Sequence, residues 1–394
     1  MSKKLVFLFM FFLLVGCVNN PSTKVKENAV SVSRQTKVKK IQNKEVKKTK
    51  AAKITPSLSP VPSSPEEEKL IEEGIKYHDK GRYKDALEKY KEVLKLNPHN
   101  VNAMSEAAFT LFEMGNYEKS LVYAKKALQY KSPLLGHVCI EAGNAYDALN
   151  KPRIALSYYK KAIEFNPNNY LPYFNAAVTL IRLNRKKEAL NCFKKTLVLN
   201  PKHSSSNFLL GAQYYEMDYI IPAILAFSRF LILEPNTERS DFARKAIQSM
   251  VAELAEEKKD KTISVKVSED PTFDGDFNEV KVAYSIIIAA RFMKKEVKFS
   301  NEYDRHAWEF DSLFSFLKDY KKDNGFVWQY YAPFFIELHE RKYTKPFVIV
   351  LYYKVYPDGA KVWLSKKEND NLFQEFYDWC FKYKFPEIDI KVDF

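Results

Sequence analysis

The sequence predicts an all-α protein: a right-handed solenoid of about five helix pairs with a capping helix, followed by a mostly helical C-terminal domain. Two observations support this. Small and aromatic residues recur about every 34 residues between residues 67 and 237, and a proline closes each period, where it would end a helix. A single helix pair cannot bury its apolar face alone, so the pairs are expected to stack. The domains expected are a signal peptide (1–17), a linker (18–65), the solenoid (66–254), a second linker (255–276) and a C-terminal domain (277–394).

The N-terminus has the layout of an export signal. Lys3 and Lys4 precede an apolar run of eleven residues, 5–15, which is too short to span a bilayer. The run closes with Leu-Val-Gly before Cys17, which resembles the bacterial lipobox. The resemblance implies that Cys17 is acylated, as with palmitate, and becomes the first residue of a mature lipoprotein. An ordinary signal peptide with an incidental cysteine, or an uncleaved anchor, is the alternative. Val18 stands where an aspartate would imply inner-membrane retention, so we expect the outer membrane, facing the periplasm.

The segment 18–65 is predicted to be a disordered tether because it lacks apolar periodicity and ends in several prolines. It carries eleven Lys or Arg residues against two Glu, so most of the net charge of +14 belongs to it. The charge therefore does not indicate a nucleic-acid partner. The lysines would suit anionic lipid or an acidic wall polymer. A plain spacer is an equally good interpretation.

The repeats are clearest in their first period. Its diagnostic residues are Gly74, Tyr77, Gly81, Tyr83, Ala86, Tyr90 and Pro98. Further periods begin at residues 101, 136, 170 and 204, with one inserted residue before the third. This pattern resembles the tetratricopeptide-repeat (TPR) family over roughly residues 67–237. The resemblance implies a solenoid that binds a protein or peptide in a concave groove lined by the first helix of each repeat.

The resemblance also implies which side chains face that groove. They are Phe109, Phe112, Asn144, Phe174, Asn175, Arg182, Phe208 and Tyr215. Phe109 and Phe174 could equally pack between helices. Ile140 replaces the lysine of the family's carboxylate clamp, which argues against a C-terminal carboxylate as ligand.

A capping helix is predicted at 239–254, where Phe242, Ala246, Met250 and Leu254 recur every four residues. A sixth, degenerate repeat is the alternative. Beyond the second linker, helices are predicted at 277–294, 308–321 and 327–341. The run 347–353 is predicted helical, with a β-hairpin, and hence an α+β domain, as the alternative. The aromatic residues of this domain are more typical of a core than of a ligand site.

No catalytic constellation is evident, so we expect no enzyme, no metal site and no cofactor. His339 and Glu340 begin like a zinc-protease motif, but Tyr343 occupies the place of the second histidine. Cys139, Cys192 and Cys380 are predicted to be buried free thiols. The sequence thus predicts a lipid-anchored envelope scaffold, with roles such as assembly of outer-membrane proteins suggested by other TPR lipoproteins. The rival is an enzyme or carbohydrate-binding activity in the C-terminal domain, positioned by the repeats.

Overall fold

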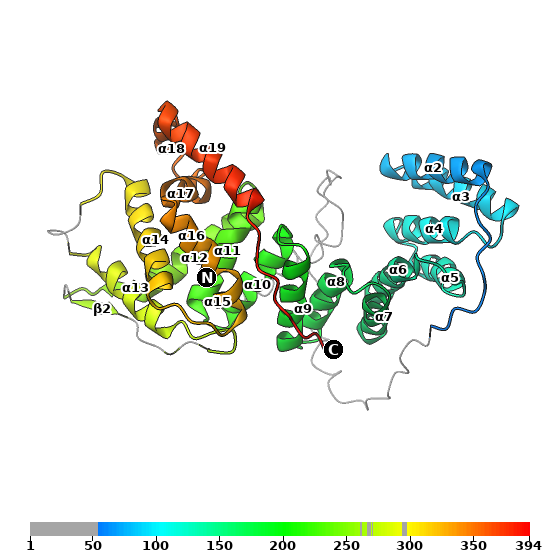
Figure 1. Cartoon of the computed structure of the whole chain (residues 1–394), viewed down its shortest axis with the longest axis horizontal. Helices are drawn as coiled ribbons and strands as arrows, with labels where there is room; N and C mark the ends of the chain where they lie inside the picture. The colour runs from blue at the N-terminus through cyan, green and yellow to red at the C-terminus, as the bar shows by residue number, and fades with distance from the viewer. Residues whose placement is uncertain (1–53, 261, 266–268, 270, 294–297) are drawn as a thin grey trace. The chain divides into compact units, whose positions relative to one another are not determined.

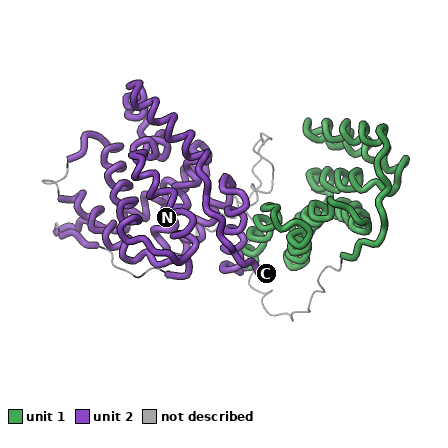
Figure 2. The backbone as a smooth tube through the Cα atoms, in the orientation of Figure 1, with its two compact units in different colours: residues 1–183, 394 green, residues 184–393 purple. Residues whose placement is uncertain are grey.

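A computed structural model describes residues 54–394 except 261, 266–268, 270 and 294–297. The predicted signal peptide, Cys17 and the basic part of the tether lie outside the described residues. The chain divides after Leu183 into two compact units, unit 1 and unit 2 (Figure 2). The boundary falls inside the predicted solenoid, between the two helices of the fourth repeat, rather than after it.

Unit 1 is built from antiparallel helix pairs (Figure 1). Its A helices are α2 (Pro65–Asp79), α4 (Val101–Glu113), α6 (Leu135–Ala148) and α8 (Leu171–Arg182). Its B helices are α3 (Tyr83–Leu96), α5 (Tyr117–Ala127) and α7 (Pro152–Phe165). Successive A helices contact one another, and each B helix packs against the A helix before it. This is the tandem arrangement that the 34-residue spacing predicts.

The turn from helix A to helix B has the same backbone conformation in every repeat. One residue in each turn has a positive φ, from 56° to 76°: Gly81, Gly115, Asn150, Asn184 and Asp218. Glycine has no Cβ to clash in this conformation, and Asn and Asp tolerate it better than most residues. These residues stand at one position of the repeat, so the sequence period corresponds to a structural one.

A glycine in helix A lets a tyrosine from helix B fill the space between the two helices. A Cβ added at Gly74 would lie 2.4 Å from Tyr90 Cε1, and one at Gly143 would lie 2.4 Å from Tyr159 Cε1. Both tyrosines are at most 1% exposed. The predicted pairing of a small with an aromatic residue is therefore present in the first and third repeats.

The last part of the predicted tether packs against unit 1. The backbone amides of Ser57 and Leu58 both donate to Gln129 O at 3.0 Å, and Lys131 N donates to Leu58 O at 2.8 Å. Asn100 Nδ2 also donates to Ser63 Oγ at 2.9 Å. These contacts attach residues 57–63 to the loops that follow α3 and α5.

Unit 2 begins with the remaining repeat helices and continues into the C-terminal helices. Its first elements are α9 (Lys186–Leu199), α10 (Ser204–Glu216), α11 (Ile220–Leu233) and α12 (Glu238–Leu254). A hairpin of β1 (Ala255–Glu257) and β2 (Ile263–Val265) follows, with Glu256 paired to Ser264. The remaining helices are α13 (Asn278–Ala290), α14 (Glu302–Asp319), α15 (Phe326–Tyr330), α16 (Ala332–Glu340), α17 (Thr344–Tyr352), α18 (Pro357–Leu364) and α19 (Lys367–Lys382).

The repeats of unit 2 are covered by the C-terminal helices. Every residue of α11 from Ile220 to Ile232 is buried, and α17 packs against this helix. The predicted capping helix exists as α12, but α13 packs on it. Arg244 of α12 is consequently only 3% exposed, and its guanidinium donates to Leu351 O, Pro235 O and Asp241. A terminal cap was expected to present such a residue to water, so α12 is an internal layer instead.

The C-terminal helices enclose an aromatic core. The run predicted as helix rather than hairpin forms α17, which confirms the all-α interpretation there. Phe310, Phe314, Phe335 and Phe347 are at most 1% exposed, and their ring centroids lie 5.0–6.0 Å apart where they contact one another. Aromatic burial of this kind accounts for the high aromatic content without a ligand site.

Part of the predicted second linker is a buried loop. Asp274 is 4% exposed; it pairs with Lys194 of α9 and accepts a hydrogen bond from Tyr214 Oη of α10 at 2.6 Å. The next carbonyl, Gly275 O, accepts a hydrogen bond from Tyr219. Trp328 Nε1 donates to Asp276 O at 2.9 Å. The loop therefore connects the repeat helices to α15 inside unit 2.

Candidate partner-binding surface

The candidate site is the inner face of unit 1, defined as the surface of α2, α4, α6 and α8 that the B helices leave uncovered. Polar side chains link each A helix to the next across this face. The contacts are His78 Nδ1 with Thr110 Oγ1 at 2.8 Å, Ser105 Oγ with Glu141 Oε2 at 3.3 Å, and Asn175 Nδ2 with Asn144 Oδ1 at 2.8 Å. The predicted groove residues of unit 1 thus partly serve to hold its own helices together.

Asn144 and Asn175 link α6 to α8 on this face. Asn144 Oδ1 accepts hydrogen bonds from Asn175 Nδ2 and, at 2.9 Å, from Tyr159 Oη. Asn144 Nδ2 and Asn175 Oδ1 have no partner among the described residues, and both side chains are half-buried. The pair therefore presents one donor and one acceptor, which matches the two polar groups of a peptide bond.

Arg182 lies on the same face but is not an isolated charge. Its Nη1 donates to Asp147 Oδ2 of α6 at 2.6 Å, and Nη2 contacts Asn150 Oδ1 at 3.4 Å. Burial raises the pKa of Asp147 even though Arg182 is beside it. The charge of Arg182 is therefore already paired with a carboxylate of unit 1.

The three predicted groove phenylalanines of unit 1 differ in exposure. Phe109 is half-buried and stacks on His78, with ring centroids 4.8 Å apart. Phe112 and Phe174 are only 9% and 6% exposed. Phe174 therefore packs between helices, which was the alternative interpretation. Phe109 remains partly exposed.

The prediction that Phe208 of α10 lines the groove is wrong. Phe208 is completely buried in unit 2, where its ring lies 5.0 Å from Phe230 and 5.8 Å from Phe242. Helices α11 and α12 enclose Phe208, so its ring is not available to a ligand. Tyr215, on the same helix, is half-buried.

Two acidic residues that the sequence prediction did not include also lie on the inner face. Glu141 is 3% exposed, accepts from Ser105, and lies 3.1 Å from His137 Nε2. Glu106 is half-buried and makes no hydrogen bond or ion pair with any described residue. Burial, and next the charge of Glu141, raise the pKa of Glu106. The hydrogen bond to Glu141 raises the pKa of His137.

A signal for these acids was present in the sequence. Glu106, Glu141 and Asn175 occupy the same position in three successive repeats, counted from residues 101, 136 and 170. This position faces the preceding A helix, and the family-based prediction considered only its neighbours in the repeat. An alignment of the repeats thus puts two carboxylates at the position of Asn175, on the two A helices that precede α8.

The stability of unit 1 should reveal that Glu106 lacks a partner. Because its pKa is raised in the folded protein, the ionised form disfavours folding above the unfolded-state pKa near 4.5, and this effect vanishes below it. We expect Glu106→Gln to raise the Tm measured by circular dichroism at pH 7.5, and the gain to shrink as the pH falls toward 4.5. Glu118→Gln is the matched control; Glu118 is exposed in the first turn of α5, where a carboxylate favours the helix, so Tm should stay unchanged or fall slightly. Equal increases for both variants would contradict this account.

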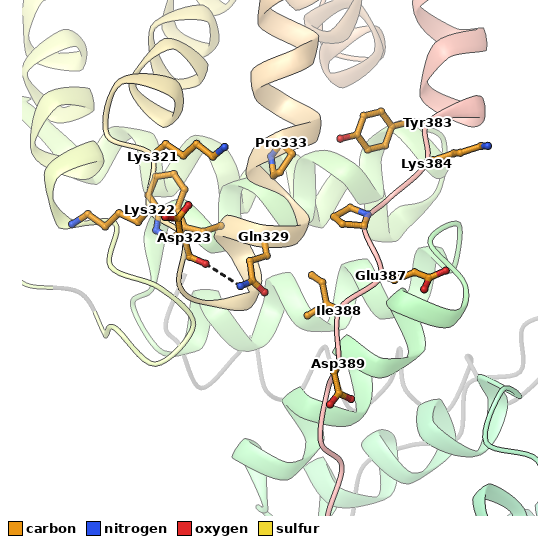
Figure 3. Close-up of a pocket in the computed structure, with 12 residues that line it drawn as sticks. Lys321, Lys322, Asp323, Gln329, Pro333, Tyr383, Lys384, Glu387, Ile388 and Asp389 are labelled. Carbon is orange, nitrogen blue, oxygen red and sulfur yellow. Dashed lines mark hydrogen bonds between the residues drawn. The ribbon is translucent and has the colours of Figure 1, made fainter.

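Unit 2 contains a separate surface pocket of about 750 Å³ beside the C-terminal segment. In Figure 3, Gln329 donates to the Asp323 backbone carbonyl, and Pro333 and Tyr383 are drawn above this pair. Lysines and carboxylates occur together around it: Lys321, Lys322, Lys384, Asp323, Glu387 and Asp389.

The histidine of the partial zinc-protease motif has a local partner. His339 Nδ1 lies 2.8 Å from Asp311 Oδ1, which also accepts from Thr344 Oγ1 at 2.7 Å. Among the described residues, no group of three or more His, Cys, Asp or Glu side chains could hold a metal ion. Cys139, Cys192 and Cys380 are buried free thiols, as predicted.

Comparison with known families identifies the class of the repeats. The TPR repeat family matches residues 74–115, and tetratricopeptide-repeat families match residues 136–169 and 158–191. These matches cover helix pairs whose turns and small–aromatic contacts were described above. The chain therefore contains tetratricopeptide repeats, and such repeats present extended concave surfaces for binding.

Solved structures of other TPR proteins resemble part of the chain. YrrB, described as a TPR protein with an unusual peptide-binding site, is 21% identical over 45% of this chain and 90% of its own, with a TM-score of 0.37. The thermophilic TPR protein TTC0263 of Thermus thermophilus is 21% identical over 46% and 99%, at 0.39. Pseudomonas aeruginosa PilF is 17% identical over 47% and 88%, at 0.40. At these values the family assignment rests on the repeats. A search of curated proteins gave no match.

Proposed function

We propose that this protein is a lipid-anchored scaffold of the bacterial cell envelope that holds an extended segment of a partner protein on the inner face of unit 1. The observation that carries the proposal is the Asn144–Asn175 pair, which leaves one amide donor and one acceptor on the open side of the A helices. A peptide backbone satisfies both groups at once, whatever its side chains. Half-buried Phe109 offers an apolar contact on the same face.

The anchor is the second part of the proposal. The lipobox-like residues ending at Cys17 favour acylation, and more than one acyl chain holds a protein stably on a membrane. We place the protein on the outer membrane, facing the periplasm. Within the described residues, no helix is long and apolar enough to cross a bilayer. Anchoring would raise the effective concentration of the inner face near its partner. Cys17→Ser should release the protein from the membrane fraction, whereas persistent membrane association would argue against the lipid anchor.

Crosslinking in the native host tests the binding surface. A photoreactive phenylalanine analogue at Ile75, which is 37% exposed on the A helix α2, should capture a partner. The same residue at Val122, 52% exposed on the B helix α5, is the matched control and should not. Capture at both positions or at neither would contradict the assignment of the inner face.

The asparagine pair should determine the strength of that capture. We expect Asn144→Leu with Asn175→Leu to reduce binding of the captured partner about tenfold, since two hydrogen bonds of about 0.5–1.5 kcal/mol each are lost. Isothermal titration with the purified full chain measures this change. Circular dichroism verifies that the helices remain. Unchanged affinity would mean that the partner contacts unit 2 instead. That outcome would favour the rival interpretation, in which the C-terminal domain is active. The buried aromatic core of that domain gives the rival no support.

A further inference from the structure

Two neighbouring polar groups of unit 1, the Tyr90 hydroxyl and the Glu106 carboxylate, have no hydrogen-bond partner among the described residues. Tyr90 of α3 is completely buried, and its hydroxyl makes no hydrogen bond with any described residue. Burial, and next the carboxylate of Glu106, raise the pKa of Tyr90, while the hydroxyl of Thr110 acts in the opposite direction. The equivalent residues two repeats later, Tyr159 and Asn175, both bond to Asn144, so the repeat geometry places Tyr90 and Glu106 in one site.

The third repeat shows what is missing there. Tyr159 occupies the position equivalent to Tyr90, and its hydroxyl is satisfied by Asn144, which in turn accepts from Asn175. The residue equivalent to Asn144 in the first repeat is Ile75, which is apolar. The residue equivalent to Asn175 in the second repeat is Glu106. The polar donor of the third repeat is therefore absent, and a carboxylate has taken the place of an amide.

The groups around this site are predominantly acidic. Asp79 of α2 and Glu141 of α6 both act on Glu106 and raise its pKa, whereas His137 acts in the opposite direction. His137 is itself within 3.1 Å of Glu141 and 51% exposed. His78 of α2 is bonded to Thr110. No lysine or arginine among the described residues pairs with Glu106, and the arginine of this face, Arg182, pairs with Asp147.

We propose that the half-buried carboxylate of Glu106, in the acidic site that it forms with the buried Tyr90 and Glu141, binds a primary amine or guanidinium group: a lysine or arginine side chain of the partner segment. An ammonium group carries three N–H donors and no acceptor, so it can satisfy the Glu106 carboxylate, which is the accessible group of this site. The inference rests on the proposed function, because it names the chemistry of the segment that the asparagine pair would hold by its backbone. The partner is then a segment with a cationic side chain two A helices away from its contact with Asn175.

A peptide probe tests this chemistry on the full chain. The probe is a fluorescein-labelled decapeptide of alternating lysine and alanine, and its counterpart carries acetyl-lysine; both are titrated by fluorescence anisotropy at low salt. We expect the lysine peptide to bind and Glu106→Gln to weaken it about tenfold, as loss of a charged hydrogen bond implies. Glu118→Gln removes the same charge from an exposed part of α5 and should change affinity less than about twofold, since exposed charges contribute little. Equal effects of the two variants, or equal binding of the acetylated peptide, would overturn the proposal.

Two further arms separate the remaining outcomes. If replacing the eleven basic residues between 24 and 53 with glutamine raised probe affinity more than tenfold, the chain's own segment would be the occupant, which overturns a separate partner. If Glu106→Gln left the crosslink at Ile75 intact while the double asparagine variant abolished it, the scaffold would stand and the amine site would fail. Amine-dependent binding with no capture at Ile75 would instead support the amine site and defeat the scaffold.

Discussion

Asp274→Leu should reduce the free energy of unfolding of unit 2 by about 3–5 kcal/mol, the range for breaking a buried ion pair by removing one partner. The change leaves the Lys194 ammonium group, which is 5% exposed, without a counter-charge, and removes the acceptor of Tyr214 Oη. Burial already lowers the pKa of Lys194 with Asp274 in place. The pair therefore gives unit 2 little net attraction, yet neither member can be removed alone without a large loss.

Urea unfolding followed by tryptophan fluorescence measures this loss selectively. All four tryptophans, Trp308, Trp328, Trp363 and Trp379, belong to unit 2. The control is Lys194→Met combined with Asp274→Leu and Tyr214→Phe, which removes both charges and the stranded hydroxyl. Because apolar replacement of a complete buried pair is often neutral, this triple variant should recover most of the stability. If the triple variant were as unstable as Asp274→Leu, docking of the loop rather than charge would be responsible.

The same loop shows where sequence reasoning reaches its limit. Asp274, Gly275 and Asp276 have the composition of a boundary, and composition predicts exposure. Their burial depends on a lysine 80 residues away in α9 and on Trp328 in α15. No local pattern encodes such a pairing. The repeats, in contrast, were predictable because each contact between a small and an aromatic residue recurs at a fixed offset.

One missed feature of unit 2 could have been found from the sequence. A B helix at the surface of a solenoid needs a polar side, as α3 has, but residues 220–233 are apolar all round except for Ser228 and Arg229. That pattern indicates a helix covered on every side. Arg229 is 1% exposed; it donates to Cys380 O at 3.2 Å, and its Cζ lies 4.8 Å from the ring centroid of Phe334 and 5.1 Å from that of Phe385. The apolar helix thus predicted a covering layer, while only the structure identifies α16 and α19 as part of it.

The sequence predicted the two amide side chains of the candidate site but not its carboxylates. The family resemblance placed Asn144 and Asn175 on one face, and the structure brings them to 2.8 Å. The resemblance also placed Phe208 in the groove, whereas the structure packs its ring against Phe230 of α11 and Phe242 of α12. The position of Glu106 on this face could have been found by aligning the repeats, but only the structure shows that its carboxylate lacks a partner among the described residues.

Gly143→Ala should damage both the stability of unit 1 and its inner face. The added Cβ would lie 2.4 Å from Cε1 and 2.7 Å from Cδ1 of Tyr159, whose ring is 1% exposed and has no room to retreat. Overpacking of this kind typically reduces stability by about 1–3 kcal/mol, despite alanine's better helix propensity. Displacement of Tyr159 would also remove its hydrogen bond to Asn144.

Gly136→Ala on the same helix is the matched control, since its added Cβ would meet neighbours only at 3.6 Å. It should be neutral or stabilise unit 1 by up to about 1 kcal/mol, through the higher helix propensity of alanine. Circular dichroism, which reports both units, should show the early transition of Gly143→Ala, while tryptophan fluorescence from unit 2 stays unchanged. Partner capture at Ile75 should fall for Gly143→Ala at temperatures where its helices remain folded. Equal behaviour of the two alanine variants would mean that the Gly143–Tyr159 contact does not set the position of Asn144.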